Sequence, residues 1–156
     1  RSTCLVRKIG SFGHNSKGDI MFSNILIPVD LADIARAKDN LKRAAQLLDN
    51  KGKITLINVV EDIPTYVEFD LPENYAAKHL VQAQDHLENM VKNEGIKAGF
   101  DILRGKPGPA ILDFAEENGV DLIIMASHKP ELMDYLIGST AARVVRHAKC
   151  SVMVIR

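Results

Sequence analysis

From residue 22 onward, apolar segments alternate with amphipathic ones, and this alternation is the strongest constraint on the fold. Apolar runs rich in β-branched residues predict buried strands at residues 24–30, 53–60, 96–103, 120–127 and 151–155. Apolar residues at three- and four-residue spacing predict helices at residues 33–50, 74–94, 110–118 and 138–148. Strands that alternate with helices in this way form right-handed crossovers and a parallel sheet. We therefore expect a doubly wound, five-stranded α/β domain with helices on both faces.

Glycine and proline residues separate these segments. Lys51–Gly52 is a stop and turn signal after the first predicted helix, and Gly119 follows the third. Residues 61–73 and 128–137 are expected as long connections. The segment RGKPGP at residues 104–109 predicts a loop, with Pro109 at a helix start, because it lacks the spacing of a phosphate-binding GxxxxGK[ST] motif.

Residues 1–20 differ in character from the rest of the chain. They show no sustained period and carry basic side chains against a single acidic one, Asp19. An apolar run begins directly after Met21, so we interpret residues 1–20 as a leader or added extension and residues 21–156 as the folded domain. The alternative is a basic arm that binds an acidic partner.

Composition excludes several classes of function. Twenty basic and twenty acidic residues give a net charge of zero, and aromatic residues make up only 5% of the chain, which argues against a nucleic-acid partner. No stretch reaches the roughly 20 apolar residues that cross a bilayer, so no membrane partner is expected. Cys4 and Cys150 are predicted to be free thiols in a reducing compartment, which favours a cytoplasmic location.

The end of the first predicted strand carries a carboxylate, Asp30. In a doubly wound sheet, ligands bind beyond the carboxyl ends of the strands, where the winding direction reverses. A carboxylate at that position can accept hydrogen bonds from ribose hydroxyls or from an adenine amine, or it can hold a metal. The alternative is that Asp30 only caps the helix that follows.

The end of the fourth predicted strand leads to a second candidate. After Ala126-Ser127-His128-Lys129, the segment Gly138-Ser139-Thr140 opens the last helix, with Ser139 expected as its N-cap. The unpaired N–H groups and positive dipole of a helix start attract anions. An ordinary capped helix after a surface loop would show the same residues.

These residues resemble the universal stress protein family. The similarity runs from about Phe22 to Arg156 and rests on ILIPVD, on INVV at the end of the second strand, and on IIMASHKP…GSTAARVVRHAKCSVMVIR. The resemblance implies the doubly wound fold, binding of ATP or AMP, and a homodimer in which the last strands meet. It also implies that Asp30 holds the ribose and that Val59 meets adenine through its backbone.

The family's nucleotide motif is only partly present. That motif is Gly, two residues, Gly, nine residues, then Gly followed by Ser or Thr. Here Ala126 and Lys129 replace the first two glycines, and eight residues separate Lys129 from Gly138. We expect Lys129 to compensate with its charge, and any Mg²⁺ to be held through the phosphates and not by protein side chains. The expected nucleotide site contains Pro28, Val29, Asp30, Val59, Met125, Ala126, Ser127, His128, Lys129, Gly138, Ser139 and Thr140.

Three functions remain open on this evidence. The first is a dimeric adenine-nucleotide-binding regulator of a stress response, paired through the edge strand Ser151–Ile155. The second is a slow ATPase or phosphotransfer protein, although no nucleophile–base pair is visible and no catalytic residue is assigned. The third is an interaction module of the same family without nucleotide. The alternative for the edge strand is that a loop or the leader shields it.

Overall fold

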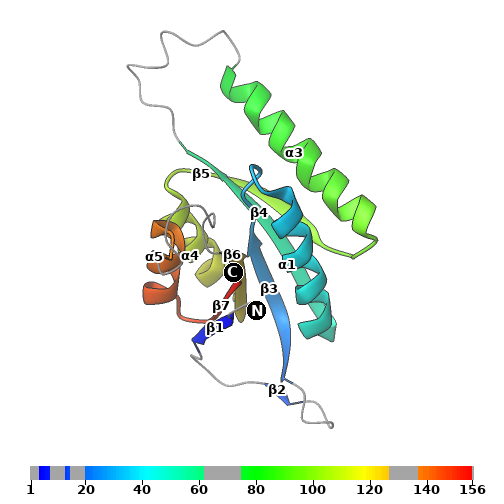
Figure 1. The fold of residues 1–156 in the computed structure, drawn as a ribbon, viewed down its shortest axis with the longest axis vertical. Coiled ribbons are helices and arrows are strands. Elements are labelled where there is room, and N and C mark those ends of the chain that lie inside the picture. The colour runs from blue at the N-terminus through cyan, green and yellow to red at the C-terminus, as the bar shows by residue number, and fades with distance from the viewer. Residues whose placement is uncertain (1–3, 8–12, 15–19, 62–74, 127–136, 156) are drawn as a thin grey trace.

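Five parallel strands form the centre of the sheet in the computed structural model, which describes residues 4–7, 13–14, 20–61, 75–126 and 137–155 (Figure 1). In spatial order β7-β6-β3-β4-β5 they are Ser151–Ile155, Leu122–Ala126, Ile20–Pro28, Leu48–Val60 and Gly99–Arg104. The order places the first strand of the domain, β3, in the middle. This confirms the predicted doubly wound α/β fold.

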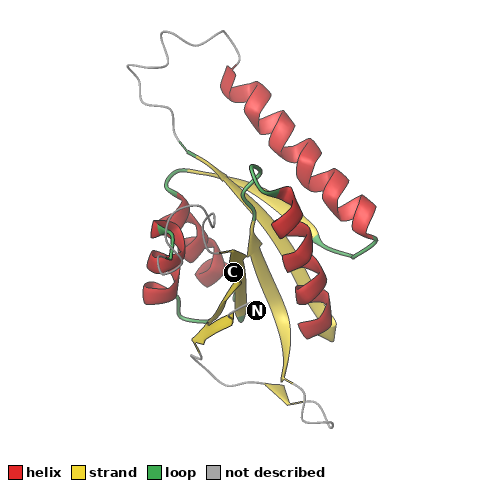
Figure 2. Ribbon diagram, in the orientation of Figure 1, coloured by secondary structure: helices red, strands yellow, loops and turns green. Residues whose placement is uncertain are grey.

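Helices cover both faces of the sheet (Figure 2). The described helices are α1 (Ile34–Leu47), α3 (Tyr75–Glu94), α4 (Pro107–Glu117) and α5 (Ser139–His147). On one face α1 and α3 contribute side chains such as Leu41 and Leu87 to a core cluster; on the other, α4 and α5 contribute side chains such as Ile111 and Val144 to a second cluster. No described helix combines the length and apolar character needed to cross a bilayer.

The helices on both faces of the sheet explain why β6 consists of consecutive apolar residues. Leu122 and Ile124 point into the core cluster under α1 and α3, whereas Ile123 and Met125 point into the cluster under α4 and α5. All four side chains are buried. A strand buried on both faces has no solvent side, and alternation of polar and apolar residues is therefore lost.

The Lys51–Gly52 stop signal is wrong as the end of a helix and the start of a loop, because both residues lie inside β4. The helix ends earlier, at Leu47. The pairing with β3 is interrupted at this point: Phe22 lies opposite Leu48, and Asn24 lies opposite Lys53. The turn-forming residues therefore loop out as a bulge in the first part of a long strand.

The prediction that Ser151–Ile155 is an edge strand is also wrong. Strand β1 (Cys4–Arg7) pairs antiparallel with β7, so that Cys4 lies opposite Ile155 and Arg7 opposite Val152. The short strand β2 (Gly13–His14) pairs with the beginning of β3. The alternative that the leader shields the last strand therefore holds for its residues Cys4–Arg7. The outer strand at that side of the sheet is β1.

Candidate functional site

The sheet reverses its winding direction between β3 and β6, its neighbour on one side. Helix α1 follows β3 on one face of the sheet, while α5 follows β6 in sequence on the other face (Figure 1). The carboxyl ends of β3, β4 and β6 therefore open toward a space with helices on both sides. This is the position where doubly wound sheets bind ligands.

A set of hydrogen bonds fixes the chain where β3 ends. The Val29 N–H donates to the Ile57 carbonyl at 2.7 Å, which extends the pairing with β4 by one residue. The Asn58 side-chain amide donates to the Val29 carbonyl at 3.0 Å. These bonds tie the end of β3 to β4 and hold the next residue, Asp30, at the carboxyl edge of the sheet.

The Asp30 carboxylate is exposed and forms a local turn. Its Oδ1 accepts a hydrogen bond from the Ala32 N–H at 2.9 Å. The helix cap is a different residue: Asp33 precedes α1, and its carboxylate accepts from the Arg36 N–H. The alternative that Asp30 caps the helix is therefore wrong. Its second oxygen, Oδ2, takes no part in this hydrogen bond and is available for a ligand hydroxyl.

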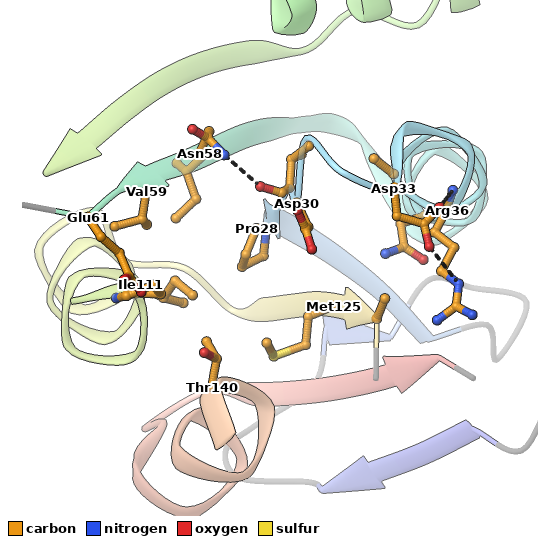
Figure 3. Close-up of a pocket in the computed structure, with 16 residues that line it drawn as sticks. Pro28, Asp30, Asp33, Arg36, Asn58, Val59, Glu61, Ile111, Met125 and Thr140 are labelled. Atoms are coloured by element: carbon orange, nitrogen blue, oxygen red, sulfur yellow. Dashed lines mark hydrogen bonds and ion pairs between the residues drawn. The ribbon is translucent and has the colours of Figure 1, made fainter. Parts of the chain in front are cut away.

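A pocket of about 400 Å³ lies at these strand ends (Figure 3). A volume of this size falls in the range of small-molecule sites. Its walls come from the ends of β3, β4 and β6, from one face of α1, and from the first turns of α4 and α5. The lining residues are Pro28, Val29, Asp30, Asp33, Arg36, Ala37, Asn40, Ile57, Asn58, Val59, Glu61, Pro107, Ile111, Met125, Ala126 and Thr140.

Seven of the twelve predicted site residues line this pocket: Pro28, Val29, Asp30, Val59, Met125, Ala126 and Thr140. Ser139 lines a neighbouring pocket of about 540 Å³, which shares Glu61, Pro107 and Thr140 with the first. Gly138 lines neither of these two pockets. Ser127, His128 and Lys129 lie outside the described residues, so their place relative to the pocket stays a prediction.

The start of α5 differs from the prediction in one detail. Gly138 is the N-cap, and Ser139 is the first residue of the helix. The Gly138 carbonyl accepts the first intrahelical bond, from the Ala142 N–H at 2.8 Å. No side chain caps this helix end. The Ser139 hydroxyl is therefore not used as a cap, and it lies exposed beside the second pocket.

The loop after β5 was predicted to extend to residue 109, but helix α4 already begins at Pro107. Pro107 lines the second pocket together with Gly105 and Lys106. Arg143 of α5 lies beside it, and the absence of a side chain at Gly108 makes room for this contact. A Cβ atom built on Gly108 would lie 2.6 Å from Cδ of Arg143. Two cationic side chains thus lie along this second pocket.

The polar wall on α1 was not predicted from the sequence. Asp33, Arg36, Ala37 and Asn40 line the pocket at positions i, i+3, i+4 and i+7, which lie on one face of a helix. Arg36 Nε forms an ion pair with Asp33 Oδ2 at 3.0 Å. One signal was available: Asn40 lies next to Leu41 within the apolar stripe, a place where a polar residue is unusual.

The pocket has two chemically different ends. In Figure 3, Val59 and Ile111 lie at one end together with the acidic Glu61, Asp33 and Arg36 lie at the other, and Asp30 lies between the two ends. We call the end that holds Val59 and Ile111 the apolar end. Such a pocket suits a ligand with a flat, largely apolar ring, a hydroxylated middle and a polar end. Among the described residues, no cluster of three or more His, Cys, Asp or Glu side chains could hold a metal ion.

Comparisons with known proteins agree with this architecture. The model of the universal stress protein family matches residues 21–156. Universal stress protein G of Escherichia coli O157:H7 is 28% identical over 146 residues, which cover 87% of this chain and 100% of the relative. The solved structure of the hypothetical protein MJ0577 is 30% identical, covers 87% of this chain and 96% of its own, and superposes with a TM-score of 0.71.

Two more distant structures share the fold and contain nucleotides. A universal stress protein in complex with cAMP is 20% identical, with a TM-score of 0.58 over 87% of this chain and 98% of that protein. The universal stress protein of Archaeoglobus fulgidus in complex with dAMP is 20% identical, with a TM-score of 0.61 over 88% of this chain and 100% of that protein.

Proposed function

The chain belongs to the universal stress protein family, and from this premise we propose that it binds an adenine nucleotide, AMP or ATP, in the pocket at the ends of β3, β4 and β6. The observation that supports the proposal most is the position of Asp30. Its exposed carboxylate lies between the apolar and the polar end of the pocket (Figure 3). The two more distant family structures described with cAMP and dAMP support the same ligand class.

In the proposed complex, the adenine ring lies at the apolar end and meets the backbone of Val59. The ribose hydroxyls donate to the Asp30 carboxylate, and the phosphates extend toward the ends of β6 and α5. Mg²⁺, when present, is held through the phosphates. We propose that nucleotide binding serves a regulator of the stress response in the cytoplasm, and we assign no catalytic residue.

Titration calorimetry with AMP and with ATP plus Mg²⁺ tests the proposal. We expect Asp30→Ala to weaken binding about ten- to a hundred-fold, because it removes a hydrogen bond between the ribose and a charged group. The matched control is Asp113→Ala, an exposed aspartate on α4 that lines none of these pockets. Its affinity should equal that of the unchanged protein.

Two results would contradict the proposal. The first is an absence of heat from either nucleotide with the unchanged protein, which would favour an interaction module without nucleotide. The second is equal affinity in Asp30→Ala and in the Asp113→Ala control. A turnover assay on the same samples distinguishes a binding protein from a slow ATPase.

We further propose that the protein forms a homodimer through β7. In the structure β1 occupies the side of β7 that faces away from β6, and pairs with residues Val152–Ile155. Two copies can therefore pair through their β7 strands only after β1 has left that position. The proposed dimer thus competes with an intramolecular strand pairing.

A further inference from the structure

The apolar end of the pocket contains an acidic side chain, Glu61, which follows directly after β4. Val60, the last residue of the strand, lies opposite Arg104, and its carbonyl accepts a hydrogen bond from the Gly105 N–H at 3.1 Å. Gly105 has a φ of 114°, which residues with a side chain rarely adopt. The chain is therefore tied to the end of β5 immediately before Glu61, and this bond fixes where the Glu61 side chain begins.

The alternation of side chains along β4 places Glu61 on the same side of the sheet as its apolar neighbours. Ile57 lies in the core cluster under α4 and α5, Val59 packs against this cluster, and Glu61 is the next residue in the same two-residue period. All three line the pocket. Figure 3 shows Glu61 beside Val59 and Ile111, on the side away from Asp30. Its carboxylate is thus a polar group at the end of the pocket that we expect to hold the base.

The Glu61 carboxylate has no ion pair or hydrogen bond with any residue in the parts of the chain that the structure describes. Lys106 and Arg143 line the second pocket, which Glu61 also lines, but neither of these cations is paired with it. Glu61 is exposed, so its oxygens meet solvent in the free protein. They can therefore accept a donor from a ligand without first breaking a bond within the described chain.

We propose that the Glu61 carboxylate accepts a hydrogen bond from the exocyclic amine of adenine, and that it thereby favours adenine over purines that lack this amine. The inference rests on the proposed function, from which it takes the ribose at Asp30 and the base at the apolar end. The ribose is attached to the five-membered ring of adenine and the amine to the six-membered ring, so the amine points away from Asp30. The amine has two N–H groups, and a bond to Glu61 leaves one for the backbone of Val59.

Paired calorimetric titrations with AMP and with purine riboside 5′-monophosphate test the assignment, because the second ligand differs from AMP only in lacking the amine. The unchanged protein should bind AMP about ten-fold more tightly than the second ligand, which corresponds to one hydrogen bond to a charged group at the low end of its range. In Glu61→Ala the ratio of the two affinities should fall to about one, because the acceptor of the amine is gone.

The ratio of the two affinities separates the proposed hydrogen bond from a general charge effect. Glu61 and the phosphate are both negative, so loss of the Glu61 charge raises the affinity for both ligands by a similar factor and leaves their ratio unchanged. Glu61→Gln keeps an acceptor oxygen without the charge, and its ratio should lie between those of the unchanged protein and Glu61→Ala. The matched control is Glu117→Ala, an exposed glutamate at the end of α4 that lines neither pocket and should keep the ratio.

The possible results distinguish this inference from the proposed function. If the unchanged protein binds neither ligand, the proposed function fails, and the inference fails with it. If the unchanged protein binds both ligands equally well, the inference alone is overturned. A preference for AMP that is as large in Glu61→Ala as in the unchanged protein would also overturn it, because another group would then recognise the amine.

Discussion

Asp121 joins three strands at the amino edge of the sheet, opposite the pocket. Its carboxylate accepts hydrogen bonds from the Ser23 N–H at 2.7 Å and the Asn24 N–H at 3.0 Å. Its backbone N–H donates to the Asn24 carbonyl, and its carbonyl accepts from the Ser151 N–H. One residue thus aligns the starts of β6 and β7 with β3.

We predict that Asp121→Ala lowers the free energy of unfolding by about 1–3 kcal/mol, because two backbone N–H groups lose their acceptor. Nucleotide affinity should not change, since the pocket is at the opposite end of the strands. Urea unfolding and calorimetry check the two statements, with Asp113→Ala as the control. A fall in affinity without a loss of stability would contradict the structural role of Asp121.

At the scale of single residues, the sequence predicted where Asp30 lies but not which aspartate caps α1. Asp30 and Asp33 are both suitable caps by residue type, and the choice depends on the turn between them. The Asp30 carboxylate is used by the Ala32 N–H inside that turn, which leaves Asp33 to cap the helix. Such local competition between nearby side chains is not visible in residue spacing.

At the scale of elements, periodicity located all four described helices and the five parallel strands. The prediction failed at residues 48–53, where the turn-forming residues Lys51 and Gly52 indicate the end of a helix. Lys and Gly are typical of turns but can also lie in a bulged strand. The α1 wall of the pocket was missed for a different reason. A periodic pattern shows which side chains face inward, but not whether they meet core or cavity.

Glu94 at the end of α3 connects the two helices that cover one face of the sheet. Its carboxylate contacts Lys42 Nζ at 3.2 Å and Lys38 Nζ at 3.4 Å, both on α1. The hydrogen bond from Lys42 is the main cause that lowers the pKa of Glu94, burial acts in the opposite direction, and the bond from Lys38 adds to the lowering. The folded state therefore favours the ionised carboxylate.

Because the pKa of Glu94 is lowered in the folded state, we predict that the effect of Glu94→Gln on stability depends on pH. A pKa that is lower in the folded than in the unfolded state gives stability that is present above the unfolded value of about 4.3 and is lost as the pH falls through the folded value. The variant should therefore be less stable than the unchanged protein at pH 7, and the difference should shrink below about pH 4.

Urea unfolding at pH 7 and pH 3 measures this difference. Glu88→Gln is the matched control, because Glu88 pairs with Lys92 on α3 itself and does not reach α1. Its effect should be smaller at pH 7. A stability difference for Glu94→Gln that is the same at both pH values would contradict the assigned ion pairs.

At the scale of the whole molecule, β1 is the feature that the sequence did not predict as part of the sheet. Residues 1–20 show no period, and the pairing of Cys4–Arg7 with β7 depends on a neighbour almost 150 positions away in the sequence. A short segment of this kind has no sequence signal of its own, because its partner determines its conformation.

We predict that Val6→Pro increases the fraction of dimer. Proline removes a backbone N–H and disfavours a strand paired along its length, so β1 should leave β7 and expose it to a second copy. Size-exclusion chromatography with light scattering at several concentrations measures the fraction. Val6→Ala keeps the N–H and should behave as the unchanged protein. Equal fractions in all three proteins would contradict a dimer through β7.

Binding of adenine nucleotide at the ends of β3, β4 and β6 can be followed by an NMR titration of the ¹⁵N-labelled chain with AMP. If AMP binds there, the amide signals of Asp30, Asn58 and Thr140 shift in a saturable way, and the signal of Asp121 on the opposite edge does not move. Absence of any saturable shift, or shifts confined to the Asp121 edge, would disprove binding at this site.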